Sequence, residues 1–263
     1  MNGAGSTSLP RRIVSVLALP VTLVAAWWIT SADSQNFYFP PLQTILHTFV
    51  KLWFSPQAVP NVLPSLLRFA VGYLAAALLG IAIGVPVGAW RTLRSLLEPM
   101  LEFLRAIPPP VLVPVLMLFA GIGDTMKTLV IVFGCIWPVL LNTVAGVRAL
   151  DDVLAEVVRS YRIGAFARLW HFVLPGASPQ IFTGLRQSLS IGIILMVVSE
   201  MFAASNGIGF ALVQYQRTFA IPEMWGGIIL LGLIGIALSL VFRAIEAWFL
   251  GWYHGLRRLQ RAA

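Results

Sequence analysis

The sequence is poor in charged residues. Asp, Glu, Lys and Arg together make up 11% of its 263 residues, whereas hydrophobic residues make up 59%. A soluble domain has about 25% charged residues, so this chain has too few polar side chains to cover a surface that faces water. The composition excludes one or two ordinary soluble domains and indicates that lipid is the solvent for most of the chain.

Cysteine is nearly absent and histidine is sparse. Cys135 is the only cysteine and lies in an apolar run, which excludes an intramolecular disulfide. His47, His171 and His254 are far apart and lack ligand spacing, so we expect no clustered Cys/His metal site. The net charge of +8 does not indicate a nucleic-acid partner, because the basic residues are spread over loops between apolar runs.

Apolar windows of about 20 residues, long enough to cross a membrane, recur along the chain. Charge-free windows cover residues 13–32, 69–90, 106–123, 128–147 and 224–242, and a sixth, 187–205, is interrupted only by Glu200. A cleaved signal peptide is the alternative for the first window, but its length and its terminal Trp27 and Trp28 are more typical of a retained helix. The sequence predicts an all-α membrane protein with about six transmembrane helices.

The basic residues predict the orientation, because Lys and Arg are enriched in cytoplasmic loops. With the N-terminus inside, ten lie on the cytoplasmic side: Arg11, Arg12, Arg91, Arg94, Arg159, Arg162, Arg168, Arg257, Arg258 and Arg261. Three lie outside: Lys51, Lys127 and Arg217. Both termini are therefore predicted to be cytoplasmic, in a plasma membrane that is the inner membrane of a bacterium.

These features divide the chain into segments. Residues 1–12 and the basic residues 251–263 are cytoplasmic tails, 13–32 the first transmembrane helix, 33–61 an outer segment, and 62–250 the other five helices with a cytoplasmic loop at about 150–178. The outer segment contains a short amphipathic helix, because its apolar residues share one helical face. They are Leu42, Ile45, Leu46, Phe49, Val50 and Trp53.

The third window contains a run of prolines just after Arg105. Pro108 and Pro109 remove backbone donors and clash with the preceding turn, so the helix must be kinked or broken. Broken backbone at membrane depth is tolerated only inside protein or beside a water-filled cavity. Arg105, Pro108 and Pro109 are therefore candidate pathway residues, with a kink that only shapes packing as the alternative. Arg68 and Arg186 lie near window ends, where we expect them to snorkel to the interface.

The window 187–205 carries an acid inside the membrane. For Glu200 a pathway or gate role and an ion pair to a neighbouring helix both stay open. Met196 and Met201 are candidate pathway residues, with ordinary helix packing as the alternative. Gly207 and Gly209 allow close backbone approach, which suits either a gate or a plain outer loop.

The cytoplasmic loop predicts a short amphipathic helix. Asp151 and Asp152 suit its first turn, and Gly164 is expected to stop it. One face is apolar and the other is charged. The apolar face holds Leu154, Val157, Val158 and Tyr161, and the charged face holds Glu156, Arg159 and Arg162. Such a ridge suits a groove on a partner protein, and an interfacial helix lying on lipid is equally compatible with the periodicity.

The same loop resembles the EAA motif of ATP-binding-cassette (ABC) importer permeases, in which a glutamate precedes a Leu-Pro pair. Glu156, Leu174 and Pro175 match the spacing of that motif. The two alanines of the motif are valines here, and its glycine position holds Arg162, with Gly164 two residues later. Residues 104–109, 145–148, 181–186 and 205–210 are similar to the nitrate/sulfonate/taurine branch of these permeases.

The resemblance implies the type I ABC importer fold, with an outer amphipathic helix and a cytoplasmic coupling helix. It implies a second permease copy, two ATPase subunits that bind ATP and Mg, and an extracytoplasmic solute-binding protein as partners. The chain lacks a Gly-x-x-x-x-Gly-Lys-Ser/Thr phosphate loop, so by itself it is expected to hold no cofactor and to be no enzyme. The implied coupling residues are Asp152, Leu154, Glu156, Val157, Val158, Arg159, Tyr161, Arg162, Gly164, Leu174 and Pro175.

The implied cargo is a small anion such as an aliphatic sulfonate, taurine or nitrate. Members of the same family that carry vitamin precursors or aromatic acids are an alternative. A gradient-driven secondary transporter is a second alternative, but repeat-related halves and paired midplane acids are not visible. A membrane-embedded enzyme would need a clustered catalytic constellation, which the scattered histidines do not provide.

Overall fold

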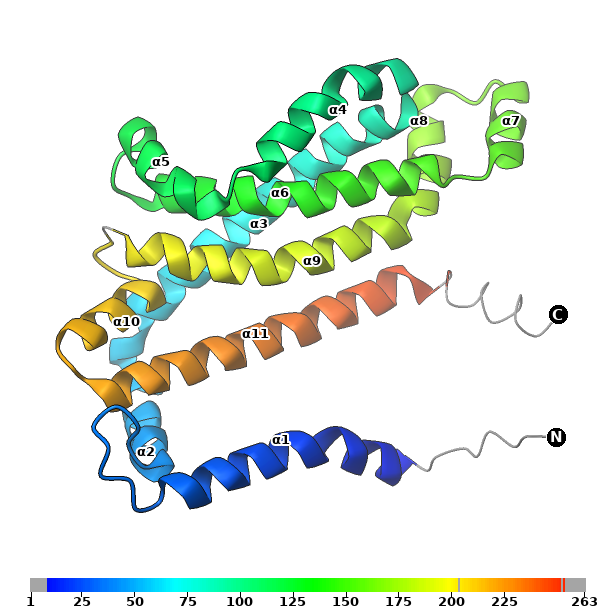
Figure 1. The fold of residues 1–263 in the computed structure, drawn as a ribbon. Coiled ribbons are helices and arrows are strands. Elements are labelled where there is room, and N and C mark those ends of the chain that lie inside the picture. Colours follow the sequence, from blue (N-terminus) through cyan, green and yellow to red (C-terminus); the bar gives the residue numbers. More distant parts are fainter. Residues whose placement is uncertain (1–8, 203, 252, 254–263) are drawn as a thin grey trace. The chain divides into compact units, whose positions relative to one another are not determined.

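The computed structural model describes residues 9–202, 204–251 and 253, and the regular structure within them is helical (Figure 1). The α-helices are α1 Leu9–Ser31, α2 Leu42–Trp53, α3 Val59–Ala89, α4 Arg91–Ala106, α5 Val113–Ala120, α6 Asp124–Arg148, α7 Asp152–Ser160, α8 Ala165–Arg168, α9 Leu174–Met201, α10 Ile208–Arg217 and α11 Ile221–Phe249. Two 3₁₀ turns, η1 Pro56–Ala58 and η2 Pro109–Leu112, and a π-turn, η3 Leu169–Val173, complete them. The predicted all-α class is confirmed.

Among the described residues, four helical stretches are long and apolar enough to cross a membrane: Pro56–Ala89, Asp124–Arg148, Ala165–Met201 and Ile221–Phe249. Helix α4 and the η2–α5 segment, bent by 83° at their junction, would together form a fifth span. Helix α1 contributes the shorter apolar helix Ala18–Ser31. Each of the six predicted windows therefore overlaps one of these segments. Most of the predicted tails, with Arg257, Arg258 and Arg261, lies outside the described residues.

The window 106–123 is not one helix. Helix α4 ends at Ala106, Ile107 and Pro108 are extended with ψ of 118° and 123°, and the chain resumes as η2 and α5. The break follows from the proline run, because the ring of Pro108 disfavours the helical conformation of the residue before it. The predicted break is confirmed. Helix α5 has only eight residues, too few to cross a membrane alone.

The described residues form two compact units. The first contains α1, α2 and Gln214–Leu230, and the second contains Val59–Val213 with α11 from Leu231 onward. In the first unit the indole of Trp225 donates a hydrogen bond to the carbonyl of Tyr38 at 3.2 Å, and its ring lies beside those of Trp27 and Phe39.

Helix α2 has the predicted amphipathic character, with a narrower buried face. Leu42, Ile45, Phe49 and Trp53 are buried, as the periodicity predicts. Leu46 and Val50 belong to the predicted face but are exposed. Only one row of apolar side chains is therefore covered within the chain.

Helix α6 packs against both α3 and α9 in the core of the second unit. The contact with α3 depends on a row of glycines on that helix, of which Gly80 and Gly84 are central. A Cβ atom added at Gly80 would lie 2.8 Å from Cβ of Val139, and one at Gly84 would lie 2.7 Å from Cβ of Thr143. Small residues spaced four apart let two membrane helices approach closely, and here they leave no room for a methyl group.

Candidate functional site

Helix α7 begins with a side-chain cap. The carboxylate of Asp151 accepts hydrogen bonds from the backbone N–H groups of Val153 and Leu154, at 2.8 and 3.0 Å. This cap satisfies two donors that the first turn of a helix leaves free. Asp152 follows in the first turn, where a negative charge is favourable beside the helix dipole. The predicted start of the helix in the loop between α6 and α9 is confirmed.

The same helix ends earlier than the sequence suggested. Arg162 has φ of +49°, and its N–H donates to the Arg159 carbonyl at 2.9 Å while that of Ile163 donates to the Val158 carbonyl at 3.2 Å. This is the Schellman arrangement, in which glycine is usual at the left-handed position. The expectation that Gly164 stops α7 is wrong, because Gly164 has φ of −58° and caps α8. Arg162, with its left-handed backbone, stands at the position where the EAA motif that this loop resembles has glycine.

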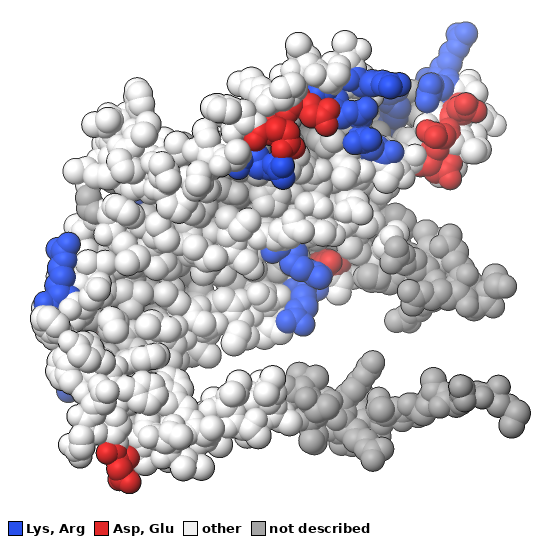
Figure 2. All heavy atoms as spheres, viewed as in Figure 1, with Lys and Arg blue, Asp and Glu red and all other residues white. Residues whose placement is uncertain are grey.

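Helix α7 presents an uncovered apolar ridge. Leu154, Val157 and Tyr161 are 54%, 44% and 79% exposed, and no residue of the helix is buried. Glu156 and Arg159 are exposed beside them. Figure 2 shows acidic and basic side chains gathered over this end of the second unit, around α7 and α4. A capped, amphipathic helix whose apolar side chains stay exposed among the described residues is suited to docking against another surface.

The connection from α7 into the membrane contains the π-turn η3. Helix α8, η3 and α9 follow without interruption, and Leu174 and Pro175 form the first residues of α9. Pro175 cannot donate a hydrogen bond, and its ring would clash with the carbonyl four residues earlier in a regular α-helix. The wider π-turn directly before it accommodates the ring. The matched Leu-Pro pair therefore marks the point where the loop becomes a spanning helix.

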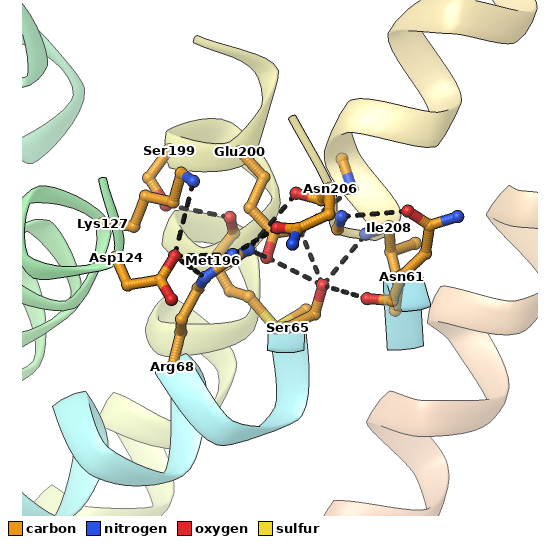
Figure 3. A network of polar contacts seen from close by, with 12 residues as sticks. Asn61, Ser65, Arg68, Asp124, Lys127, Met196, Ser199, Glu200, Asn206 and Ile208 are labelled. Atoms are coloured by element: carbon orange, nitrogen blue, oxygen red, sulfur yellow. Dashed lines mark hydrogen bonds and ion pairs between the residues drawn. The ribbon is translucent and has the colours of Figure 1, made fainter. Parts of the chain in front are cut away.

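A second set of polar residues lies inside the second unit, around the buried carboxylate of Glu200 (Figure 3). The Ser65 hydroxyl lies 2.7 Å from Oε1 of Glu200, and the Gly209 N–H donates to Oε2 at 3.1 Å. Nη1 of Arg68 donates to Oε1 at 2.8 Å. These donors come from α3 and from the start of α10, so the carboxylate joins three elements. Of the two readings of Glu200, the ion pair to a neighbouring helix is present.

Arg68 links this carboxylate to the start of α6. Its guanidinium pairs with Asp124 at 2.6 Å and donates to the Asn206 side chain, and Nζ of Lys127 lies 3.7 Å from the same aspartate. Arg68 and Lys127 are 4% and 3% exposed. The expectation that Arg68 snorkels is therefore wrong. Lys127, which the sequence predicts in an outer segment, is buried in the first turn of α6. Two cations and two carboxylates compensate one another at this place.

The turn after α9 is folded onto Glu200. Gly207 has φ of +121°, and a Cβ there would lie 2.5 Å from the carboxylate carbon. A Cβ at Gly209 would lie 2.4 Å from the Val197 carbonyl oxygen. The N–H of Gly207 donates to the Asn61 side chain at 3.1 Å. At both positions the backbone lies so close to α9 that only glycine fits. The hydrogen bond to Asn61 also holds the turn against α3.

The other candidate pathway residues lie elsewhere. Arg105, which pairs with Glu102, and Pro109 line a cavity of about 470 Å³ together with Trp137, Asn142 and Gln187. Met196 is buried in the hydrophobic core, whereas Met201 is 45% exposed. The predicted pathway residues therefore fall into two groups. Arg105, Pro108 and Pro109 lie at the helix break and its cavity, and Gly207 and Gly209 lie against Glu200.

Several residues of the polar cluster escaped sequence reasoning. Asn61 and Ser65 belong to no motif, and Asn206 was noted only as part of the similar stretch 205–210. The partners of all three lie more than a hundred positions away. The available signal was a balance of charge. Arg68 lies at the edge of one apolar window and Glu200 lies inside another. A charged side chain at membrane depth needs a partner of opposite charge, so the two residues could have been paired from the sequence.

These features define a polytopic helical membrane protein with a broken span and an exposed amphipathic helix between two of its spans. A family model described as "Binding-protein-dependent transport system inner membrane component" matches residues 76–252, and the chain belongs to this family. The predicted membership of the ABC importer permeases is thereby confirmed.

Two relatives are similar over nearly their whole length. The chain is 30% identical over 254 residues to the "Taurine transport system permease protein TauC" of Escherichia coli (strain K12), covering 93% of this chain and 92% of that protein. It is 30% identical over 238 residues to the "Putative aliphatic sulfonates transport permease protein SsuC" of Bacillus subtilis (strain 168), covering 90% and 86%.

The fold is similar to that of a solved permease chain. In the structure described as "Inward facing conformations of the MetNI methionine ABC transporter", the similar chain gives a TM-score of 0.62 at 17% identity, covering 73% of this chain and 95% of that one. At this identity the similarity concerns the fold alone, and it confirms the predicted type I importer architecture.

Proposed function

We propose that this permease forms the membrane pathway for a small anion of the sulfonate or oxyanion type, driven by a separate ATPase that docks on α7. The observation that carries the docking proposal is the exposed ridge of α7, with Leu154, Val157 and Tyr161 uncovered on a helix held by a side-chain cap. Closure of the ATPase would move α7, and the continuous α8–η3–α9 rod would carry that movement into the membrane.

The proposed cargo follows from the relatives and from one polar cavity. Both relatives described above are named for sulfonate compounds. The cavity beside the helix break offers the Arg105 guanidinium with the amides of Asn142 and Gln187, groups that donate hydrogen bonds to anionic oxygens. Nitrate and similar oxyanions share this chemistry.

The proposed assembly contains two permease copies, two ATPases that bind ATP and Mg, and an extracytoplasmic solute-binding protein. The loop arginines support a topology with both termini in the cytoplasm, which places α7 on the ATPase side. In a bacterium the assembly would reside in the inner membrane.

Reconstitution tests this function. The permease is purified with its ATPase and binding protein, and ATP-dependent uptake of a labelled sulfonate is measured in proteoliposomes. Leu154→Asp and Glu156→Lys are expected to reduce both ATPase co-purification and uptake, since both alter the face that docks. Lys51→Glu is the control, because it reverses a charge on α2, which belongs to the other compact unit. Uptake that persists without ATP, or in Glu156→Lys at the wild-type rate, would contradict the proposal.

A further inference from the structure

A polar pocket lies between α9 and α11, away from both sites described above. It has a volume of about 370 Å³ and is lined by Arg186, Leu189 and Ser190 of α9 and by Ser239, Phe242 and Arg243 of α11. Figure 2 shows a small group of basic and acidic side chains over these two helices, separate from the charges around α7. Arginine is costly on a spanning helix, so this group requires a partner.

The charges in the pocket do not cancel. Arg186 forms an ion pair with Glu246 of α11. Arg243 is exposed and has no ion-pair partner among the residues that the structure describes. The group therefore carries a net charge of +1. Arg243 precedes the end of α11 at Phe249 by six residues, which is about 9 Å along a helix, so its long side chain can reach the lipid headgroup layer.

An apolar groove continues directly from the pocket. A second cavity, of about 440 Å³, shares Ser190, Ser239 and Arg243 with the first and extends along Ile193, Ile194, Gly232, Gly235 and Ile236. On α9 these residues lie farther from Leu174, and on α11 they lie farther from Phe249. The polar end of the combined cavity thus faces the side that carries α7, and its apolar end runs toward the middle of the span.

From this arrangement we propose that the α9–α11 cavity binds one anionic phospholipid. Its phosphate would accept hydrogen bonds from Arg243, Arg186 and the two serine hydroxyls, and one acyl chain would lie in the groove floored by Gly232 and Gly235. A phosphodiester carries one negative charge, which balances the net +1 of the group. Basic pockets between membrane helices bind anionic headgroups in this way, and guanidinium groups match phosphate oxygens in geometry.

The charge and shape of the cavity favour lipid over a second copy of the chain. An apolar protein face would fill the groove but leave Arg243 without a counter-charge. A free phosphate would neutralise Arg243 but leave the groove empty. The lipid belongs to the leaflet on the α7 side, and calling that leaflet cytoplasmic rests on the proposed function.

Native mass spectrometry of the purified permease tests the proposal. The chain is exchanged into mixed micelles that contain equal amounts of phosphatidylglycerol and phosphatidylcholine, and retained lipid and subunit mass are read from the same spectra. The wild type is expected to retain one phosphatidylglycerol per chain. Arg243→Gln and the double variant Arg186→Gln/Arg243→Gln are expected to retain about tenfold less, because hydrogen bonds to a charged group are lost. Arg91→Gln, which removes a cation at the start of α4, is expected to behave as the wild type.

Gly232→Leu separates the possible occupants. A Cβ at Gly232 meets nothing within 4 Å, so a leucine projects into the groove and should displace the acyl chain while leaving the arginines in place. Loss of phosphatidylglycerol in this variant supports the lipid. Displacement of the lipid by inorganic phosphate, equal retention of phosphatidylcholine, or loss of the permease dimer in Gly232→Leu with lipid retained would each overturn the proposal. Uptake is measured separately, so failure of the lipid site and failure of the transport function are distinguishable.

Discussion

The Nη1 atom of Arg68 lies 2.8 Å from Oε1 of Glu200, and their side chains are 4% and 0% exposed (Figure 3). Removing one partner of such a pair leaves a buried charge without compensation, which typically costs about 3–5 kcal/mol. Arg68→Met and Glu200→Gln are each expected to lower the midpoint of thermal unfolding in detergent. The double variant should lose less than the sum of the two, because neither charge is then left alone. Additive losses would contradict direct coupling.

Gly207→Ala is expected to destabilise the protein more than Gly121→Ala, the same substitution at another glycine with positive φ. Both Gly207 and Gly121 have positive φ, but a Cβ at Gly121 meets nothing within 4 Å, whereas one at Gly207 meets the Glu200 carboxylate. Gly121→Ala should cost about 1–3 kcal/mol, because φ of 72° with ψ of −177° is a backbone conformation that is essentially restricted to glycine. Gly207→Ala should cost about 1–3 kcal/mol more than that, because the carboxylate must also shift. Equal thermal stability of the two variants would show that the turn yields to the added methyl group.

Arg162→Gly is expected to stabilise the end of α7. The left-handed conformation of Arg162 costs a side-chain-bearing residue about 1 kcal/mol, and glycine adopts it readily. Amide hydrogen exchange of α7 in the purified permease should therefore slow by a few-fold. Gly164→Ala is the control, since its φ of −58° suits alanine. Slower exchange in Gly164→Ala but not in Arg162→Gly would contradict the position of the cap.

Gly84→Ala is expected to separate α3 from α6. The added methyl group would lie 2.7 Å from Cβ of Thr143 and 3.0 Å from the Leu140 carbonyl oxygen, so the helices must move apart, at a cost of about 1–3 kcal/mol. Gly232→Ala makes the same change inside α11 without a neighbour within 4 Å. It should be neutral or slightly stabilising, because alanine favours the helix. Thermal unfolding in detergent compares the two, and equal effects would contradict close packing.

Local patterns predicted the elements of this fold well. The acids Asp151 and Asp152 and the spacing of Leu154, Val157 and Tyr161 are confined to one short segment, so they located α7 correctly. The proline run located the helix break for the same reason. The end of α7 was misplaced because helices commonly end at a glycine, and Gly164 is the glycine in this segment. In the structure it is Arg162 that adopts the left-handed conformation.

Long-range pairing was beyond the reach of sequence patterns. The partners Arg68 and Glu200 are 132 positions apart, and periodicity says nothing about which helices become neighbours. Position near a window end suggested that Arg68 reaches water, but the packing of α3 against α6 and α9 encloses it. Lys127 is enclosed as well, and Asp124, one turn earlier on the same helix, provides its counter-charge.

The balance of charge around Glu200 also concerns the electrical gradient across the membrane. Arg68 and Lys127 carry two positive charges, and Asp124 and Glu200 carry two negative ones. Work done by a membrane voltage on a moving group is proportional to its net charge, which is zero for these four side chains together. If they move as one body, voltage neither drives nor opposes their displacement, and the energy for any movement must come from elsewhere.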